Sequence, residues 1–188
     1  MRKEAEMTIN GKALLEERFA SSLGLDKYTY LVRQAQKVNI AEDKDFQRVF
    51  NAFYRVRKNA AWRDQFYELF ERAKKENLSF EDILTFLYIK TNNVEASFAS
   101  KMAATIDPSS PIIDQYVLKN LNIIIAGAGK EARLESALEA FESLQTWYRD
   151  YLPTQAAKDN IAVFDTMLPS YSWISDVKKI DFLLWIKR

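Results

Sequence analysis

The stretch that decides the fold is Val94-Glu-Ala-Ser-Phe-Ala-Ser-Lys-Met-Ala-Ala-Thr-Ile-Asp-Pro-Ser-Ser-Pro-Ile-Ile-Asp-Gln-Tyr-Val117. It predicts a short helix, a loop bounded by Pro108 and Pro111, and a second helix, because proline disfavours helical backbone in the residue before it. An amine, Lys101, falls in the early turns of the first helix, and a carboxylate, Asp114, opens the second. Together these two groups can supply nucleophilic attack on a sugar carbon and electrostatic support for the cation that forms.

The composition favours helix throughout a single domain. The chain has 188 residues, of which 48% are hydrophobic and 28% charged, close to a soluble globular average. Four glycines and four prolines are too few for an all-β protein with many tight turns. We therefore expect an all-α domain spanning residues 1–188.

Apolar residues recur three and four positions apart along nearly the whole chain, which predicts a succession of helices. The expected helices are Ala13–Ser22, Lys27–Val38, Asp43–Lys58, Ala61–Glu76, Phe80–Thr91, Ala96–Ile106, Ile112–Asn120, Lys130–Tyr151, Thr154–Met167 and Ile174–Lys187. Ser79 and Thr154 are expected to cap helix starts, and Asn77 to end a helix. Residues 121–129 form an apolar run that ends in Gly127-Ala-Gly129. This run predicts a strand or an extended loop, and a linker is favoured over a phosphate-binding loop because a third glycine is missing.

Several classes of chemistry are excluded by composition. The chain contains no cysteine and no histidine, which removes disulfides, thiolate zinc sites and imidazole catalysis. The N-terminal residues carry charges but no apolar run, so a signal peptide is not expected, and no apolar stretch is long enough to span a membrane. We expect a cytoplasmic monomer that uses no metal or other cofactor and binds no membrane.

One segment is strongly basic although the net charge is only +1. Between Arg55 and Arg63 there are four basic residues and no acidic one, interleaved with aromatic residues: Arg55, Arg57, Lys58 and Arg63, with Tyr54 and Trp62. The segment is either a solvated helix end and turn or a patch that contacts phosphate groups. The low net charge argues against a protein coated in nucleic acid.

The order of helix, hairpin Asn92-Asn-Val-Glu95, helix and capping aspartate resembles the helix-hairpin-helix DNA glycosylase superfamily. More narrowly, the motifs Ser97-Phe-Ala-Ser-Lys101 and Pro111-Ile-Ile-Asp114 look like the signature of compact bacterial proteins related to 8-oxoguanine glycosylase. The aromatic helices upstream, including 46–57 and 66–70, are also similar to that group. The resemblance covers roughly residues 46–121.

This resemblance implies a two-lobed helical fold with the helix-hairpin-helix region at about residues 79–120. It implies DNA repair on a duplex with a damaged base, in which Lys101 attacks the anomeric carbon to form a Schiff base and Asp114 stabilises the oxocarbenium-like charge. The target base would be flipped out of the stack. The basic segment and the hairpin residues Asn92 and Asn93 would contact the DNA backbone.

Two departures from the superfamily pattern keep a second interpretation open: the sequence of the hairpin, and the separation of only 13 positions between Lys101 and Asp114, which is shorter than usual in the superfamily. The superfamily hairpin is usually glycine-rich, whereas asparagine tolerates the left-handed conformation and Glu95 would repel a phosphate. Lys101 could instead be a surface lysine beside a capping Ser100, and Asp114 a simple helix cap. The alternative to a glycosylase is therefore a non-catalytic DNA- or protein-interaction module with the same fold.

Overall fold

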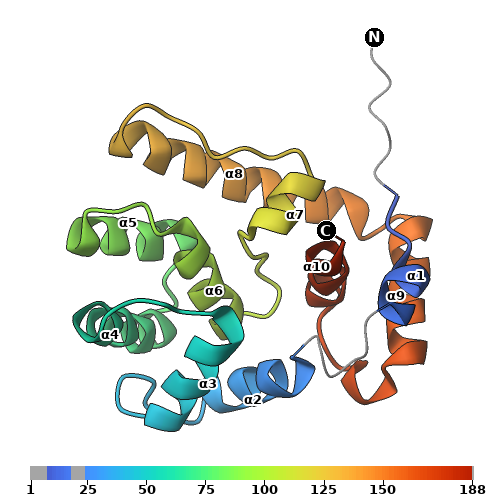
Figure 1. Ribbon diagram of the computed structural model, residues 1–188, viewed down its shortest axis with the longest axis horizontal. Coiled ribbons are helices and arrows are strands. Elements are labelled where there is room, and N and C mark those ends of the chain that lie inside the picture. Colours follow the sequence, from blue (N-terminus) through green and yellow to red (C-terminus); the bar gives the residue numbers. More distant parts are fainter. Residues whose placement is uncertain (1–7, 18–23, 188) are drawn as a thin grey trace.

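The computed structural model describes residues 8–17 and 24–187 (Figure 1). Within these ranges 71% of the residues are helical and none lies in a strand. The predicted all-α class is confirmed. No helix in the described ranges is both long enough and apolar enough to cross a membrane.

The helices follow one another with short connections. They are α1 (Gly11–Glu16), α2 (Leu25–Ala35), α3 (Lys44–Tyr54), α4 (Ala60–Glu76), α5 (Phe80–Thr91), α6 (Ala96–Ile106), α7 (Gln115–Asn120), α8 (Lys130–Tyr151), α9 (Gln155–Met167), the 3-10 turn η2 (Pro169–Tyr171) and α10 (Asp176–Ile186).

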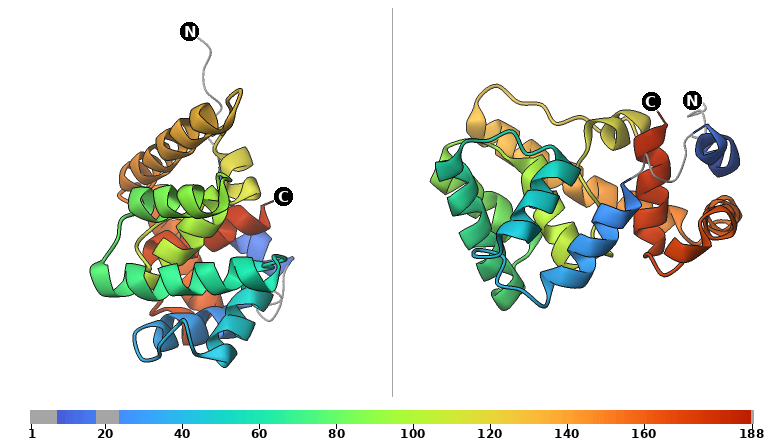
Figure 2. Two further views of the ribbon diagram at one scale, coloured as in Figure 1. Left: turned by 90° about the vertical axis from the view of Figure 1, so that its left-hand side faces the viewer. Right: turned by 60° about the horizontal axis from the view of Figure 1, so that its bottom comes forward.

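The helices gather into two groups on either side of α10. In Figure 1, α2 to α6 lie on one side of α10, and α1 and α9 lie on the other; the views in Figure 2 agree. Helix α6 contacts α2, α4 and α5, while α10 contacts α1, α7 and α9. Helix α8 connects the first group to α10, because Phe141 stacks on Phe80 of α5 and the Tyr148 hydroxyl donates a hydrogen bond to Asp181 of α10.

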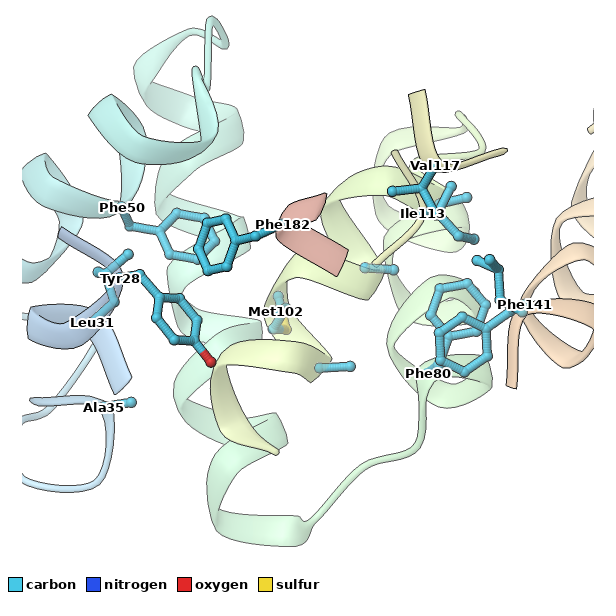
Figure 3. Packing of buried hydrophobic residues seen from close by; sticks show 14 of the residues in the cluster. Tyr28, Leu31, Ala35, Phe50, Phe80, Met102, Ile113, Val117, Phe141 and Phe182 are labelled. Carbon is cyan, nitrogen blue, oxygen red and sulfur yellow. The ribbon is translucent and has the colours of Figure 1, made fainter. Parts of the chain in front are cut away.

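Helix α6 lies deep in the first group because its side chains are small. Its buried residues are Ala96, Ala99, Ser100, Met102, Ala103, Ala104 and Thr105. Alanine at several faces lets neighbouring helices approach closely, and burial around most of a helix is typical of a core position. In Figure 3, Met102 lies between the stacked rings of Phe80 and Phe141 and the pair of Tyr28 and Phe182. The rings of Tyr28 and Phe182 meet edge to face with their centres 5.6 Å apart. The site residue Lys101 is therefore carried by a helix that packing holds firmly.

The predicted helix caps are confirmed. The Ser79 hydroxyl accepts a hydrogen bond from the Asp82 N–H, and the Asp82 carboxylate accepts from the Ser79 N–H, which completes a capping box. Thr154 caps α9 through the Ala157 N–H. Asn77 ends α4 in the left-handed conformation, with φ of 52°.

Three predicted boundaries are wrong for local reasons. The helix expected to run to Lys58 ends at Tyr54, because Arg55 takes the left-handed conformation and the Val56 N–H turns back to the Asn51 carbonyl. The helix expected from Ile112 begins at Gln115, because the backbone of Asp114 is extended. The first helix begins earlier than expected, and its predicted end at Ser22 lies outside the described residues.

The segment of residues 121–129 is an extended loop and not a strand. Gly127 has φ of 135°, and a Cβ there would come within 2.7 Å of the Ala132 carbonyl carbon. The glycine thus allows the loop to fold back onto the first turn of α8. This close approach accounts for Gly127 without a phosphate ligand.

Candidate active site

One pocket brings Lys101 and Asp114 together. It has a volume of about 330 Å³ and lies where α3, α6, α7 and α10 meet. Aromatic side chains line much of it: Tyr54, Tyr116, Phe182 and Trp185. A mostly apolar hollow with a few converging charged groups is the usual form of a binding site for a small molecule or an extruded group.

Ser100 joins helix α6 to the loop that precedes α7. Its fully buried hydroxyl accepts a hydrogen bond of 2.9 Å from the N–H of Ile113. Ser100 directly precedes Lys101, and Ile113 directly precedes Asp114. This one bond therefore ties the loop before α7 to α6 at the point where both candidate catalytic residues emerge.

Lys101 is not the surface lysine of the alternative interpretation. It is half-buried in the middle of α6, whose first turn is preceded by Glu95 and not by Ser100. Its ammonium lies 5.3 Å from the ring centre of Phe98 and 5.6 Å from that of Tyr54. Aromatic faces stabilise a cation at this range, and they also exclude water from it.

The surroundings of Lys101 favour a neutral amine. Burial lowers its pKa below the ordinary value, the charge of Asp114 opposes this, and the charge of Lys178 lowers the pKa further, with a smaller opposing effect from Asp181. A depressed pKa is what a lysine nucleophile requires, because only the neutral amine has a free electron pair.

Asp114 has two roles at once. Its Oδ1 accepts a hydrogen bond of 2.8 Å from the Tyr116 N–H and so caps α7, as the capping interpretation expects. Its side chain also lines the pocket. Among the described residues no ion pair within 4.0 Å joins it to Lys101, so the amine is not neutralised by a direct carboxylate contact.

Helix α10 supplies a wall of the pocket that the sequence analysis missed. Lys178 and Asp181 form a buried ion pair of 2.6 Å, and the Tyr148 hydroxyl donates to the second Asp181 oxygen at 3.2 Å. Burial raises the pKa of Asp181, and the Lys178 charge opposes that rise. The available signal was a lysine and an aspartate three positions apart, of which the aspartate lies in the otherwise apolar segment 180–186.

The basic segment does not converge on one surface. Arg55 and Arg57 are exposed, and Arg55 lies at the pocket. Lys58 is half-buried and holds the Glu95 carboxylate at 2.5 Å. Arg63 lies on α4 along a separate groove beside α3. The segment is thus a loop after α3 and the start of α4, with two of its four cations exposed and one of these, Arg55, at the pocket.

The hairpin between α5 and α6 keeps its turn without glycine. Asn92 takes the left-handed conformation with φ of 53°, as its residue type predicts, and Asn93 is exposed beside it. The Glu95 side chain makes no cap to α6. Since Lys58 neutralises Glu95, the expected repulsion between this carboxylate and a phosphate is reduced.

Tyr116 lines the pocket, and Trp62 of the basic segment does not. Trp62 instead stacks on Phe66 with ring centres 4.9 Å apart and packs against Phe98. No three acidic side chains in the described ranges gather closely enough to hold a metal ion. A comparison of the chain with protein-family models, with curated proteins and with solved structures finds no match in any of the three.

Proposed function

We propose that the protein is a DNA glycosylase with lyase activity that acts on a damaged base, resembling the 8-oxoguanine type, with Lys101 as nucleophile and Asp114 as its carboxylate partner. One observation carries the proposal. Lys101 and Asp114, chosen from sequence motifs, line the same aromatic pocket, and the amine has a lowered pKa and no direct ion pair in the described structure.

The arrangement of the helices supports the same proposal. Two groups of helices flank α10, and the pocket lies where α7 and α10 meet α3 and α6 of the first group. A two-lobed helical fold is what the resemblance to helix-hairpin-helix glycosylases implies. The hairpin, with Asn92 and Asn93 exposed, would approach the DNA backbone.

The proposed reaction needs only these two side chains. The neutral Lys101 amine attacks the anomeric carbon, the bond to the damaged base breaks, and the base departs with the electron pair. Asp114 stabilises the positive charge that develops on the sugar. Loss of a proton from nitrogen and opening of the sugar ring then give the Schiff base, from which strand cleavage follows.

A specific observation favours the non-catalytic alternative. The net charge is +1, and Lys58 is already engaged by Glu95, which takes one of the four cations of the basic segment away from a duplex. Duplex binding depends on the number of phosphates neutralised. Weak binding without chemistry would fit an interaction module with the same fold.

Borohydride trapping tests the proposal. Reduction of a Schiff base fixes the protein to the DNA, so the wild-type protein should form an adduct on duplexes that carry an abasic site or an oxidised purine. Lys101→Gln should abolish the adduct, and Asp114→Asn should slow its formation more than it weakens DNA binding.

A matched control is available outside the pocket. Lys158 is exposed on α9 and does not line the pocket, so Lys158→Gln removes a surface amine and should leave trapping unchanged. Circular dichroism checks the fold of each variant. An undiminished adduct in Lys101→Gln, or no adduct with the wild-type protein across the whole panel, would refute the proposed chemistry.

A further inference from the structure

The ion pair of Lys178 and Asp181 has no part in the proposed reaction, yet it is almost fully buried. The two side chains are 4% and 9% exposed, with Nζ and Oδ2 2.6 Å apart. Burying two charges is expensive, and well-packed apolar residues often replace such a pair without loss of stability. Stability alone therefore does not explain why charges occupy this part of α10.

The structure holds the Lys178 cation at one defined place. Its ammonium lies 5.5 Å from the ring centre of Tyr28 and 5.7 Å from that of Phe182. Asp181 is held in turn by the Tyr148 hydroxyl. The carboxylate and two aromatic faces leave the cation little freedom to move, and it lines the same pocket as Lys101.

We propose that Lys178, held by Asp181, is a positioning residue of this site: its buried cation lines the same pocket as Lys101 and favours the neutral, nucleophilic form of the Lys101 amine. The role of Lys101 as nucleophile rests on the proposed function, whereas the electrostatic effect on its amine does not.

The balance of charges around Lys101 supports this role. The titratable or charged groups near it come from several elements: Lys27 of α2, Tyr54 of α3, Arg55 and Lys58 of the following loop, Asp114 at the start of α7, and Lys178 and Asp181 of α10. Lys58 is paired with Glu95, and it shares only the Phe98 ring with Lys101. The effect of Lys178 on Lys101 is larger than the opposing effect of Asp181, so the pair as a whole favours the neutral amine.

The same arrangement distinguishes the two lysines chemically. Both lysines lie over aromatic rings, but Lys178 is paired with a carboxylate, while Lys101 has no carboxylate within ion-pair distance in the described chain. Although both lysines line one pocket, the Lys101 amine can therefore react while the charge of Lys178 lowers the pKa of that amine.

The test is a titration of lysine side chains by nuclear magnetic resonance on protein labelled with carbon-13 at the lysine ε position. The Lys101 signal is assigned by its loss in Lys101→Gln. In Lys178→Met the pKa of Lys101 should rise, because a nearby like charge is lost. In Lys178→Arg, which keeps the charge, the pKa should stay close to that of the wild-type protein.

The pH profile of borohydride trapping should move to higher pH in Lys178→Met, with about a tenfold lower rate at neutral pH for each pH unit of displacement. If this variant does not fold, Lys178→Met combined with Asp181→Asn removes both charges and should still raise the pKa of Lys101, by less. An unchanged or lowered pKa of Lys101 in the folded variant would overturn the inference. The titration needs no DNA, so a rise of the pKa without any trapping would refute the proposed function and leave the inference standing.

Discussion

The hydrogen bond from the Ile113 N–H to the Ser100 hydroxyl is the contact whose removal should separate the two catalytic candidates. Ser100 is fully buried, and Ile113 is 3% exposed. Ser100→Ala leaves a buried N–H without a partner, which costs about 1–3 kcal/mol. In a chain of this size that corresponds to a fall of about 2–12 °C in Tm.

The same substitution should also impair trapping, because the loop that carries Asp114 is no longer fixed to α6. A misplacement of about 1 Å can lower a rate about a hundredfold. We therefore expect a loss of trapping rate of roughly tenfold to a hundredfold at unchanged DNA affinity. Stability is measured by urea and thermal unfolding followed by circular dichroism.

Ser97→Ala is the matched control on the same helix. The Ser97 side chain is half-buried, and it is the backbone carbonyl of Ser97 that accepts from the Ser100 hydroxyl. This variant should stay within about 0.5 kcal/mol of the wild-type protein. If Ser100→Ala and Ser97→Ala lose equal stability and equal activity, the bond to Ile113 does not position Asp114.

Two further predictions concern charge. Arg57→Ala should reduce the slope of log association constant against log salt concentration for duplex binding by about 0.9. Lys58→Ala should reduce this slope by less, because Glu95 already neutralises Lys58. Fluorescence anisotropy over a salt series measures both slopes, and equal reductions would contradict the ion pair between Lys58 and Glu95. For Glu71, burial opposes ionisation, but hydrogen bonds led by that of Lys74 outweigh it and lower the pKa. Its contribution to stability is therefore present above the unfolded pKa of about 4.3 and is lost as pH falls through the lower folded value. Glu71→Gln should accordingly lower the urea midpoint at pH 7 more than at about pH 3, and an equal loss at both would contradict this sign.

Local signals in the sequence were sufficient for most helix ends. Ser79, Thr154 and Asn77 act within a few residues of themselves, so their caps can be predicted without knowledge of the fold. Arg55 could not be predicted to end α3 in the left-handed conformation, because a non-glycine residue rarely adopts it and nothing nearby in sequence marks it. The extended backbone before α7 depends on Ser100, which lies on another helix.

The candidate site was predicted only in part for the same reason. Lys101 and Asp114 were found because they belong to contiguous motifs. The burial of Lys101 depends on Tyr54 and on α10, which are distant in sequence. The pair of Lys178 and Asp181 has helical spacing that equally fits a solvated face, so only packing reveals it as a buried wall of the pocket.

The position of α10 has a consequence for synthesis of the protein. This helix is translated after all the other described helices. Hydrogen bonds connect it to earlier segments: the Ser175 hydroxyl donates to the Pro108 carbonyl, and the Asn120 side-chain amide donates to the carbonyls of Leu184 and Lys187. A nascent chain can fold its earlier helices first. Such a chain already carries Lys101 and Asp114 but lacks the wall of their pocket that α10 supplies, so the Lys101 amine is enclosed only after α10 has been synthesised.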